Sequence, residues 1–366
     1  MPQIHQSWQT LFLELSNPQQ PLPVESVSWA MTEILEERAT EAQTAAFILG
    51  LKVRGESPEQ VTALANVMMS HANVVPESHG HSVVLDIVGT GGDGSQSVNI
   101  STMAAIVASA CGVPVIKHGN RAVSSSTGAA DVLEELGVVI DANPDQVAQI
   151  AGEAGIAFCF APRHHPAMRF AAPARKQLGI PTVFNVLGPL TNPARANAAL
   201  IGAANASLAP IMAKVLLDRG VKALVVRGDE GLDEISLAHP TRIWDVTSGD
   251  LHETAVTPSD FGVGDFDAEL LRGGERQRNA ELARKVLGGE QPGSDASRVD
   301  AIRLSVAVNA AAALVAADAV TKPVGESSVA ERINSNLPKT REVLESGAAW
   351  DVLNRWIAVS GAVTSQ

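Results

Sequence analysis

The sequence has 366 residues, and its 45% hydrophobic and 18% charged content is ordinary for a globular enzyme with a large core. Lys and Arg number 27 against 40 Asp and Glu, so the net charge is −13, which argues against nucleic acid or an anionic membrane as the main partner. The same balance leaves room for a locally basic pocket, and the length favours one large domain with a smaller one beside it.

The first 80 residues predict a short amphipathic lead followed by three helices. The first helix is expected over 24–37, and the second over 41–54, with Thr40 as its cap and Gly55 at its end. A capping-box pattern at 57–60 opens the third. The second helix has more apolar residues than a single buried face needs, which fits either packing within the domain or contact with a second subunit.

Two predicted strands and the loops after them carry the most unusual residues of the chain. Residues 83–88 form a short β-branched apolar run that suits a buried strand, and four glycines follow within 89–94. Glycine lets the backbone take positive φ and lets a ligand approach closely. Good N-cap residues at 99–102 then precede an apolar helical run. A second strand, at 113–116, leads into a segment with cations, a glycine and hydroxyls at 117–127, so both strand ends supply groups that bind phosphate.

The same stretch excludes two common nucleotide-binding motifs. Gly89, Gly91 and Gly94 match the pattern G-x-G-x-x-G, but the helix starts several residues late and the next strand ends in Lys117 instead of an acid. No Gly-Lys-Ser/Thr sequence closes the loop, which argues against a P-loop.

From residue 83 onward strands and helices alternate, which predicts a parallel sheet covered on both faces. Further strands are expected at 156–160, 199–203 and 222–226, and two more at 243–246 and 251–256 around a turn. Because ligands bind at the carboxyl ends of parallel strands, the residues that follow the strands should converge on one active site. They are the glycine loop, residues 117–121, the basic segment 163–169, and the acids Asp229, Glu230, Asp233 and Glu234.

These residue types favour group transfer from a phosphorylated donor bound to Mg²⁺. Two neighbouring carboxylates on a loop suit Mg²⁺, which takes few carboxylates together with waters and substrate phosphates, although a solvated acidic turn is the usual alternative. His164 and His165 are adjacent and have no Cys or His partner at zinc-ligand spacing. No G-x-S-x-G elbow and no Cys/His nucleophile pattern stands out, so covalent catalysis is not indicated.

Five motifs, in the right order over most of the chain, make the sequence resemble the anthranilate phosphoribosyltransferases, a family related to the pyrimidine nucleoside phosphorylases. They are GTGGD at 89–93, NIST at 99–102, KHGNRAVSS at 117–125, NVLGPLTNP at 185–193 and GLDE at 231–234. GTGGD alone is a weak signal, but the five together are highly specific.

The resemblance implies a nucleoside phosphorylase-like α/β fold, in which a small helical domain is hinged to a larger α/β domain with a mostly parallel central sheet. The helical domain would comprise residues 1–80 and about 166–194, and would form a homodimer. The α/β domain, which binds the donor, would comprise residues 81–165 and 195–366.

The resemblance also implies the Mg²⁺-dependent transfer of the 5-phosphoribosyl group from phosphoribosyl pyrophosphate (PRPP) to the amine of anthranilate, in L-tryptophan biosynthesis. Donor-binding positions would be Gly89, Thr90, Gly91, Gly92, Asp93, Asn99, Ser101, Thr102, Lys117, Ser125, Ser126 and Thr127. Positions linked to two Mg²⁺ ions would be Ser101, Asp233 and Glu234. Anthranilate would contact Gly89, His118, Asn120, Met168 and Arg175, with Arg175 at its carboxylate. No residue would act as acid, base or nucleophile; the reactants would be positioned by Lys117, Asn120 and Arg175.

Arg227 departs from this family, whose members usually have His before the glycine that precedes the acidic loop. The change could be neutral, or Arg227 could pair with a nearby acid or a phosphate. Two other function classes stay open: a phosphoribosyltransferase or nucleoside phosphorylase-like enzyme with another acceptor, and a non-enzymatic homologue that binds nucleic acid. His118, Asn120 and Arg175 argue against the first, and the net charge of −13 argues against the second.

The sequence also predicts where the protein resides. Cys111 and Cys159 lie in apolar runs, so a disulfide framework is not expected. The first residues lack a basic segment followed by an apolar one, and no apolar run approaches the ~20 residues that span a bilayer. We therefore expect a cytoplasmic protein without a membrane partner.

Overall fold

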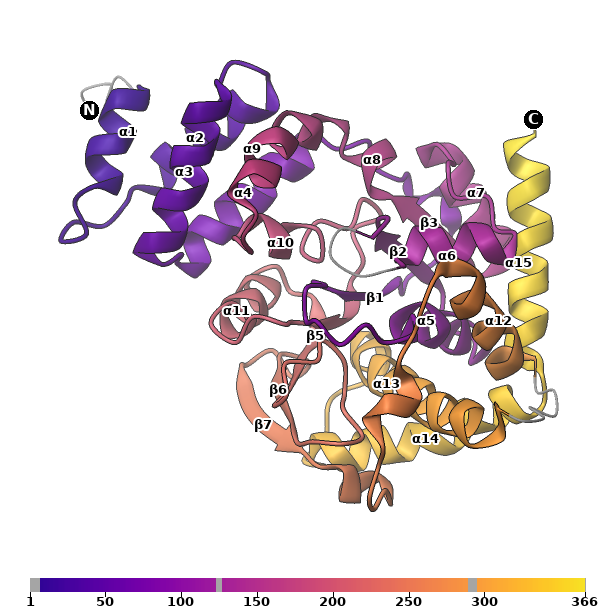
Figure 1. Cartoon of the computed structure of the whole chain (residues 1–366). Coiled ribbons are helices and arrows are strands. Elements are labelled where there is room, and N and C mark those ends of the chain that lie inside the picture. The colour runs from indigo at the N-terminus through magenta and orange to yellow at the C-terminus, as the bar shows by residue number, and fades with distance from the viewer. Residues whose placement is uncertain (1–6, 123–126, 289–294, 366) are drawn as a thin grey trace.

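The computed structural model describes residues 7–122, 127–288 and 295–365. It has a helical unit at the N-terminus and a larger α/β unit, whose C-terminal helix lies at the far side of the molecule from the first helix (Figure 1). The predicted helical unit and the predicted central sheet are therefore both confirmed.

The N-terminal helices are α1 (Trp8–Leu15), α2 (Val24–Leu35), α3 (Glu41–Arg54) and α4 (Pro58–Ser70). Thr40 and Ser57 cap α3 and α4, and in each case a glutamine at the third helical position closes a capping box. Later segments return to this unit, because α9 (Ala172–Leu178) contacts α3 and α10 (Phe184–Leu187) contacts α4. The helical unit thus combines two parts of the chain that are far apart in sequence.

The sheet has seven strands in the order β3-β2-β1-β4-β5-β6-β7. Their bounds are β1 (Leu85–Gly89), β2 (Val115–Gly119), β3 (Ile156–Phe160), β4 (Ala198–Gly202), β5 (Lys222–Gly228), β6 (Thr241–Asp245) and β7 (His252–Val256). The first five pair in parallel, and β6 and β7 are antiparallel. β1 lies between β2 and β4, so the order of the strands reverses direction beside β1. Ligands bind at such a reversal in open parallel sheets.

Helices cover both faces of the sheet, as the strand and helix alternation predicts. On one face α5 (Ile100–Ala110) and α13 (Ala296–Thr321) pack on β1 and β4. On the other, α11 (Ala209–Asp218) packs on β5 and also contacts α4, so one apolar cluster joins this face to the helical unit. The remaining elements are α6 (Ala129–Leu136), α7 (Pro144–Ala154), α8 (Ala161–His164), α12 (Arg276–Leu287), α14 (Val329–Glu345), α15 (Ala348–Thr364) and the short 3-10 helices Glu77–His79, Pro166–Phe170, Pro258–Phe261 and Ala268–Leu271.

The long helix α13 corrects one expectation from the sequence. It has 26 residues and is long and apolar enough, by length and composition, to cross a membrane. However, 78% of its most apolar stretch is buried inside the structure, where it contacts α5, α14, β4 and β5. We conclude that α13 is the central core helix of the α/β unit.

β1 and β2 separate toward their carboxyl ends. Their register contains the single pair Leu85 and Val115, whereas β1 pairs with β4 and β2 pairs with β3 as far as the last residue of each strand. Backbone groups in the resulting gap need partners from elsewhere, because buried N–H and C=O groups are rarely left unpaired.

Candidate active site

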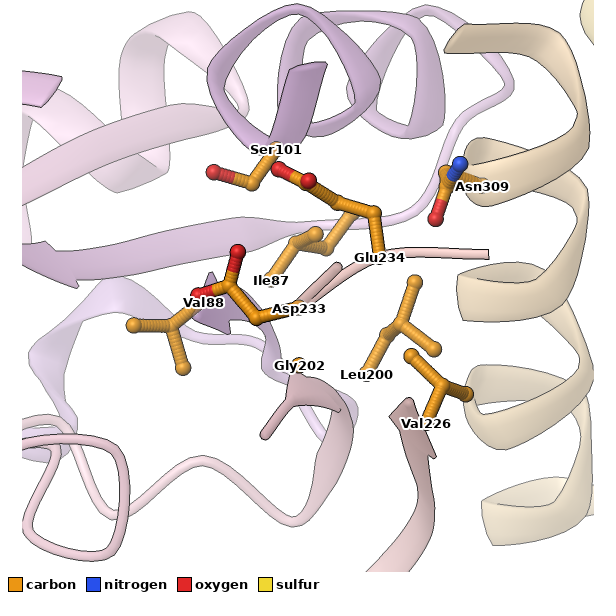
Figure 2. Close-up of a pocket in the computed structure, with 9 residues that line it drawn as sticks. All are labelled: Ile87, Val88, Ser101, Leu200, Gly202, Val226, Asp233, Glu234 and Asn309. Carbon is orange, nitrogen blue, oxygen red and sulfur yellow. The ribbon is translucent and has the colours of Figure 1, made fainter. Parts of the chain in front are cut away.

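A small pocket lies at the carboxyl edge of the sheet, beside the first turn of α5 (Figure 2). Its apolar lining comes mainly from the ends of β1, β4 and β5, and its polar groups come from α5, α13 and the loop after β5. The residues around it are Ile87, Val88, Ser101, Leu200, Gly202, Val226, Asp233, Glu234 and Asn309. The three residues that the sequence linked to Mg²⁺ therefore meet in one place.

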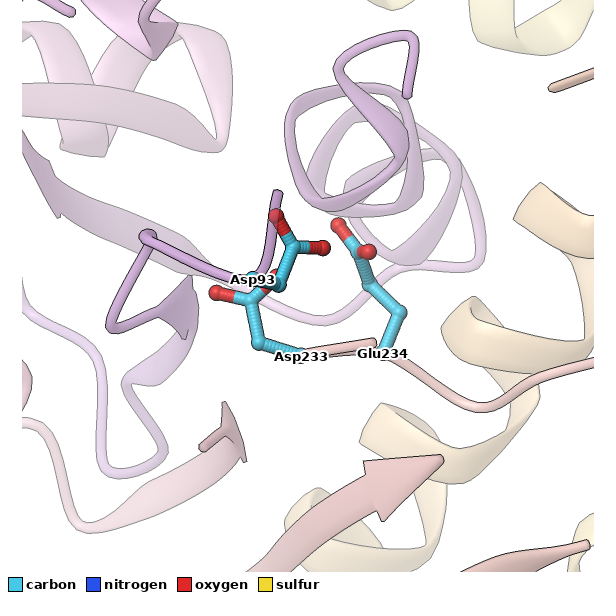
Figure 3. Close-up of side chains that lie close together, drawn as sticks. All are labelled: Asp93, Asp233 and Glu234. Atoms are coloured by element: carbon cyan, nitrogen blue, oxygen red, sulfur yellow. The ribbon is translucent and has the colours of Figure 1, made fainter. Parts of the chain in front are cut away.

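Three carboxylates converge beside this pocket (Figure 3). Asp233 and Glu234 belong to the loop after β5, and Asp93 comes from the glycine loop after β1. One oxygen of each lies within 4.8 Å of the others, which is close enough for a single cation to contact all three. The sequence placed Asp93 with the donor, and the structure shows that it also belongs to the acidic group.

The electrostatics of this cluster favour a cation. Burial, with a further contribution from Asp93, raises the pKa of Asp233 to about 7. Burial and the charge of Asp233 also raise the pKa of Glu234 well above its usual value. Asp93 Oδ2 and Glu234 Oε2 are buried and receive no hydrogen bond from the described part of the chain. Carboxylate oxygens of this kind fit Mg²⁺, which would relieve their mutual repulsion.

Glycines bring the two loops together. Gly91 donates its N–H to Asp233 Oδ2 at 2.7 Å, and the glycine loop takes positive φ at Gly91, Gly92 and Gly94. At Gly202, the end of β4, a Cβ would lie 1.5 Å from the backbone oxygen of Asp233. Gly202 is thus required by the fold of the acidic loop, and sequence reasoning missed it although it lies within a predicted strand.

Asn309 is a second residue that sequence reasoning missed. It is buried in the middle of α13, where its Oδ1 accepts the N–H of Ile235 at 2.9 Å and its Nδ2 donates to the Ile235 oxygen at 3.2 Å. These two bonds anchor the acidic loop to the core helix directly after Glu234. An amide inside an Ala-rich apolar run was the available signal.

Lys117 is more buried than the sequence suggested. Only 2% of it is exposed, and its Nζ donates to the Ile87 oxygen and lies 3.4 Å from Ser101 Oγ. Burial lowers the pKa of Lys117, while the charges of Asp86, Glu234 and Asp233 oppose that effect. Its ammonium group therefore lies near the acidic cluster and is bonded to β1.

Two predicted donor positions, Asn99 and Thr127, are joined by a hydrogen bond. Asn99 stands at the N-cap position of α5 but does not cap it, contrary to expectation; instead, its Nδ2 donates to the Thr127 oxygen at 3.0 Å. Thr90 Oγ1 accepts the N–H of Ala204 at 3.0 Å. Thr102 is buried, and its hydroxyl has no hydrogen-bond partner within the described residues. Two further predicted positions, Ser125 and Ser126, lie outside the described residues.

On the acceptor side, two buried histidines have fixed tautomers. His118 Nδ1 lies 2.9 Å from the Gly188 oxygen and His165 Nε2 lies 2.8 Å from the Thr191 oxygen, so each of these nitrogens must carry the proton. The two ring centroids are 5.1 Å apart. Burial lowers the pKa of His118 well below its usual value and that of His165 to about 4, so both rings are neutral near pH 7. His165 was not predicted as a site residue, although its segment was singled out.

The remaining predicted acceptor residues lie on three segments. Arg175 is on α9, with its guanidinium 5.7 Å from the Phe184 ring centroid. Within the described part of the chain this guanidinium makes no hydrogen bond or ion pair. Met168 is half-buried in the 3-10 helix Pro166–Phe170. Asn120 is exposed just after β2, where its Oδ1 accepts the N–H of Arg121 at 2.8 Å.

Arg227 bonds to the backbone at the base of the acidic loop. Its Nε donates to the Ala204 oxygen at 3.0 Å and its Nη1 to the Gly228 oxygen at 3.2 Å. None of its hydrogen bonds in the described chain reaches a carboxylate. Its observed role is to join the loop after β4 to the end of β5.

Known proteins match both units. Residues 81–350 match the glycosyl transferase family, a/b domain, and residues 14–72 match the glycosyl transferase family, helical bundle domain. The chain is 46% identical over 341 residues to the anthranilate phosphoribosyltransferase of Streptomyces griseus, which covers 93% of this chain and 92% of the relative. It is 44% identical over 360 residues to that of Thermobifida fusca, covering 98% and 99%.

Solved structures agree over nearly the whole length. The crystal structure of anthranilate phosphoribosyltransferase from Thermus thermophilus superposes with a TM-score of 0.83 at 38% identity, covering 97% of this chain and 99% of that chain. The Saccharomyces cerevisiae enzyme in complex with PRPP and Mg superposes with a TM-score of 0.84 at 28% identity, covering 98% and 99%. The resemblance seen in the sequence motifs is thus confirmed, and the chain belongs to the anthranilate phosphoribosyltransferase family.

Proposed function

We propose that the enzyme carries out its family's reaction at the carboxyl edge of the sheet, between the glycine loop and the acidic loop. In that reaction the 5-phosphoribosyl group passes from PRPP to the amine of anthranilate, as a step of L-tryptophan biosynthesis. The observation that carries this assignment is the convergence of Asp93, Asp233 and Glu234 beside Ser101. The yeast structure in complex with PRPP and Mg, which shares this fold, supports it.

Asp233, Glu234 and Ser101 would hold Mg²⁺, two ions when PRPP is bound, and Asp93 would lie beside them. When bound, the metal would neutralise charge on the diphosphate leaving group. The chain's own part is to supply carboxylates whose buried oxygens lack hydrogen-bond partners among the described residues. Backbone N–H groups of residues 89–93, with the side chains of Asn99 and Thr102, would bind the donor. Ser125, Ser126 and Thr127 would complete that site, and the buried Lys117 would add positive charge.

The acceptor would lie between the sheet edge and the helical unit. Arg175 would bind the anthranilate carboxylate, because a guanidinium fork can donate to both carboxylate oxygens. Gly89, His118, Asn120 and Met168 would line the path to the ribose. The neutral His118 and His165 would hold the segment 188–191 in place through its carbonyls.

The chemistry needs no nucleophilic or acid-base residue from the chain. A bond forms between the amine nitrogen and the anomeric carbon of ribose, while the bond from that carbon to diphosphate breaks and its electron pair leaves with pyrophosphate. The product nitrogen then loses a proton to water. Since an aromatic amine attacks an oxocarbenium-like centre with little help, positioning by Lys117, Asn120 and Arg175 would supply most of the catalysis.

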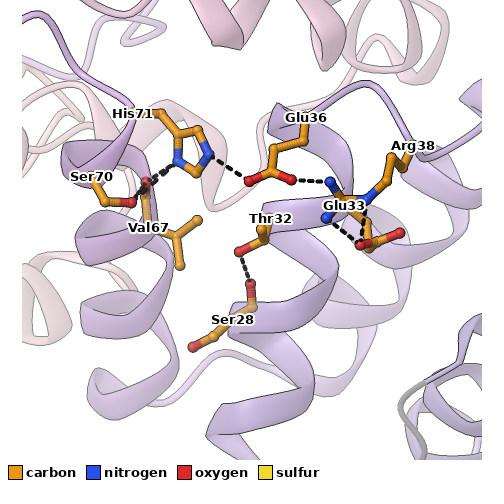
Figure 4. Close-up of polar contacts among 8 residues, drawn as sticks. All are labelled: Ser28, Thr32, Glu33, Glu36, Arg38, Val67, Ser70 and His71. Atoms are coloured by element: carbon orange, nitrogen blue, oxygen red, sulfur yellow. Dashed lines mark hydrogen bonds and ion pairs between the residues drawn. The ribbon is translucent and has the colours of Figure 1, made fainter.

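The helical unit would move as one body against the α/β unit. It would comprise residues 1–80 and about 166–194, with 81–165 and 195–366 in the α/β domain, as α9 and α10 pack on α3 and α4. Figure 4 shows how the ends of α2 and α4 are joined, with His71 Nε2 3.4 Å from Glu36 Oε1. Arg38 bonds to Glu33 and Glu36 in the same cluster. Motion of such a body would change the distance between Arg175 and His118.

We also infer a cytoplasmic homodimer formed through the helical unit. Leu13, Leu49 and Val53 are 67%, 41% and 81% exposed on α1 and α3, which contact each other. Large apolar side chains that are exposed together on one unit are typical of a protein contact surface. Within the second predicted helix, Phe47 and Leu51 pack inside the domain, which leaves Leu49 and Val53 for contact with a second subunit.

The test is loss of anthranilate fluorescence on mixing with PRPP and Mg²⁺, beside reactions without donor or without metal. We expect loss only when both are present. Loss without Mg²⁺ would contradict the metal site, and binding of PRPP without loss of anthranilate would contradict the acceptor.

A further inference from the structure

Asp86 is a buried carboxylate on β1 to which the reaction above gives no role. It is 2% exposed and lies between the apolar residues Leu85 and Ile87. A charge so deep in the sheet is costly unless it is fully bonded. Its contacts therefore indicate what it is for.

The contacts of Asp86 fall in the gap between β1 and β2. Its Oδ1 accepts the backbone N–H of His118 at 3.2 Å, a donor that would otherwise belong to the strand ladder. Its Oδ2 accepts a hydrogen bond from Asn192 Nδ2 at 2.8 Å. Asn192 also donates to the Ile116 oxygen of β2 at 2.7 Å. A residue from the segment between α10 and β4 thus bridges the two separated strands.

This arrangement connects the acceptor residues to one another. His118 lies near the end of β2, and its Nδ1 donates to the oxygen of Gly188, four residues before Asn192. The side chain of Asp86 consequently fixes two things at once, the backbone of His118 and the end of the segment 188–192. Both oxygens of a carboxylate are needed, because both partners are donors.

We propose that Asp86 is a positioning residue for the acceptor, which sets the segment 188–192 against His118 through Asn192. The inference rests on the proposed function, in which His118 lines the anthranilate site. It predicts that loss of the bond between Asp86 and Asn192 weakens binding of anthranilate, and that binding of PRPP changes little as long as the charge of Asp86 is kept.

The experiment is steady-state kinetics with anthranilate and PRPP varied in turn. Asp86→Asn keeps the size of the side chain but places an amide N–H against one of the two donors. We expect the KM for anthranilate to rise about tenfold. Because the charge of Asp86 also acts on Lys117, the KM for PRPP is compared in Asn192→Ala, which keeps that charge and should change this KM less than about twofold. Asn192→Ala removes the other partner, so it should raise the KM for anthranilate in the same way, and it serves if Asp86→Asn does not fold.

A reciprocal exchange makes the test specific. In Asp86→Asn with Asn192→Asp, an amide at position 86 can donate to a carboxylate at position 192, so the bond between the two positions can form again while the bond to the Ile116 oxygen stays lost. Part of the lost anthranilate affinity should therefore return. Asp245→Asn is the matched control: Asp245 is also a buried carboxylate, 4% exposed, but it pairs with Arg332. This control should lower the melting temperature and leave both KM values unchanged.

Equal rises in both KM values in Asn192→Ala, or purely additive losses in the exchange, would overturn the role of Asp86. Either result is meaningful only with an active parent enzyme. If the parent itself does not consume anthranilate, the proposed function fails instead, so the two failures are distinguishable.

Discussion

At the scale of single residues, Arg175 is a half-buried cation whose charge is not balanced by a described carboxylate. Burial lowers its pKa, which raises the benefit of binding an anion. We predict that Arg175→Ala lowers kcat/KM for anthranilate by roughly 30- to 150-fold, as expected from losing about 2–3 kcal/mol of charged hydrogen bonding. The KM for PRPP should stay nearly unchanged in the same assay.

Lys176→Ala provides the matched control for this substitution. Lys176 is the neighbouring cation on α9 and is exposed, so its removal should change neither KM. An equal fall of kcat/KM for anthranilate and for PRPP in Arg175→Ala would contradict a role at the anthranilate carboxylate.

Asp233 makes the metal-free protein sensitive to pH. Its pKa rises from near 4 in an unfolded chain to about 7 in the folded one, so the folded state binds more protons between these values. Stability should therefore fall as pH rises from about 4 to about 7, and the cost, on the order of a few kcal/mol, is fully present above pH 7. Asp233→Asn should consequently raise the melting temperature more at pH 8 than at pH 5.

Calorimetry in the presence of a chelator tests this prediction. Adding Mg²⁺ should then stabilise the parent but not Asp233→Asn, which would also lose Mg²⁺-dependent turnover. Asp229→Asn alters an exposed acid of the same loop and should behave like the parent. A variant that is less stable than the parent at pH 8 without metal would argue against repulsion within the cluster.

Lys117 and Asn99 show where prediction from single residues stops. Their positions near the site followed from the strand ends, and the structure places both there. Their hydrogen-bond partners could not be predicted from the strand ends. Lys117 bonds to the Ile87 oxygen, and Asn99 bonds to the Thr127 oxygen. Both partners are backbone groups from other segments, which a sequence pattern around one residue does not contain.

At the scale of elements, the end of β4 determines how closely the acidic loop can pack against the sheet. A methyl group at Gly202 would overlap the backbone oxygen of Asp233, which is part of the loop itself and not a flexible side-chain tip. We predict that Gly202→Ala displaces the loop and weakens the apparent affinity for Mg²⁺ at least tenfold, since overpacking of this kind costs about 1–3 kcal/mol or more. Initial rates measured over a range of Mg²⁺ concentrations test this.

Gly325→Ala is the comparison for Gly202→Ala. A Cβ at Gly325 would have no neighbour within 4 Å, so the same substitution there should leave the Mg²⁺ dependence unchanged. An unaltered Mg²⁺ curve for Gly202→Ala would mean that the acidic loop tolerates movement.

The elements themselves were largely predictable. The strand at 156–160 was placed to the residue, and the other strands within a few residues, because short apolar runs between turn residues are a strong signal. The helix α3 was likewise bounded by its cap and by Gly55. By contrast, Gly202 and Asn309 act on a loop that is distant in sequence, so their role depends on strand order and helix packing.

At the scale of the whole molecule, the proposed homodimer would form through the exposed apolar residues of α1 and α3. We predict that Val53→Asp converts a dimer into a monomer, because a charge would have to be buried at the contact. Light scattering after size exclusion should give twice 38.1 kDa for the parent and 38.1 kDa for the variant.

Leu251→Asp is the control for introducing a charge at an exposed apolar residue outside α1 and α3. Leu251 is an exposed apolar residue, 37% accessible, beside β7 and remote from α1 and α3 in sequence. This variant should remain dimeric. A monomeric parent, or a dimer that survives Val53→Asp, would place the subunit contact elsewhere.

The return of α9 and α10 to the N-terminal helices has a consequence for synthesis of the chain. Phe47 and Leu64 share one apolar cluster with Ala171 and Phe184, which emerge from the ribosome about 100 residues after α4. At about 5–20 residues per second, the first helices wait roughly 5–20 seconds for these partners. Meanwhile their apolar faces are open to chaperones or to other nascent chains. The helices that are made first can therefore complete their core only after about half of the chain has been made.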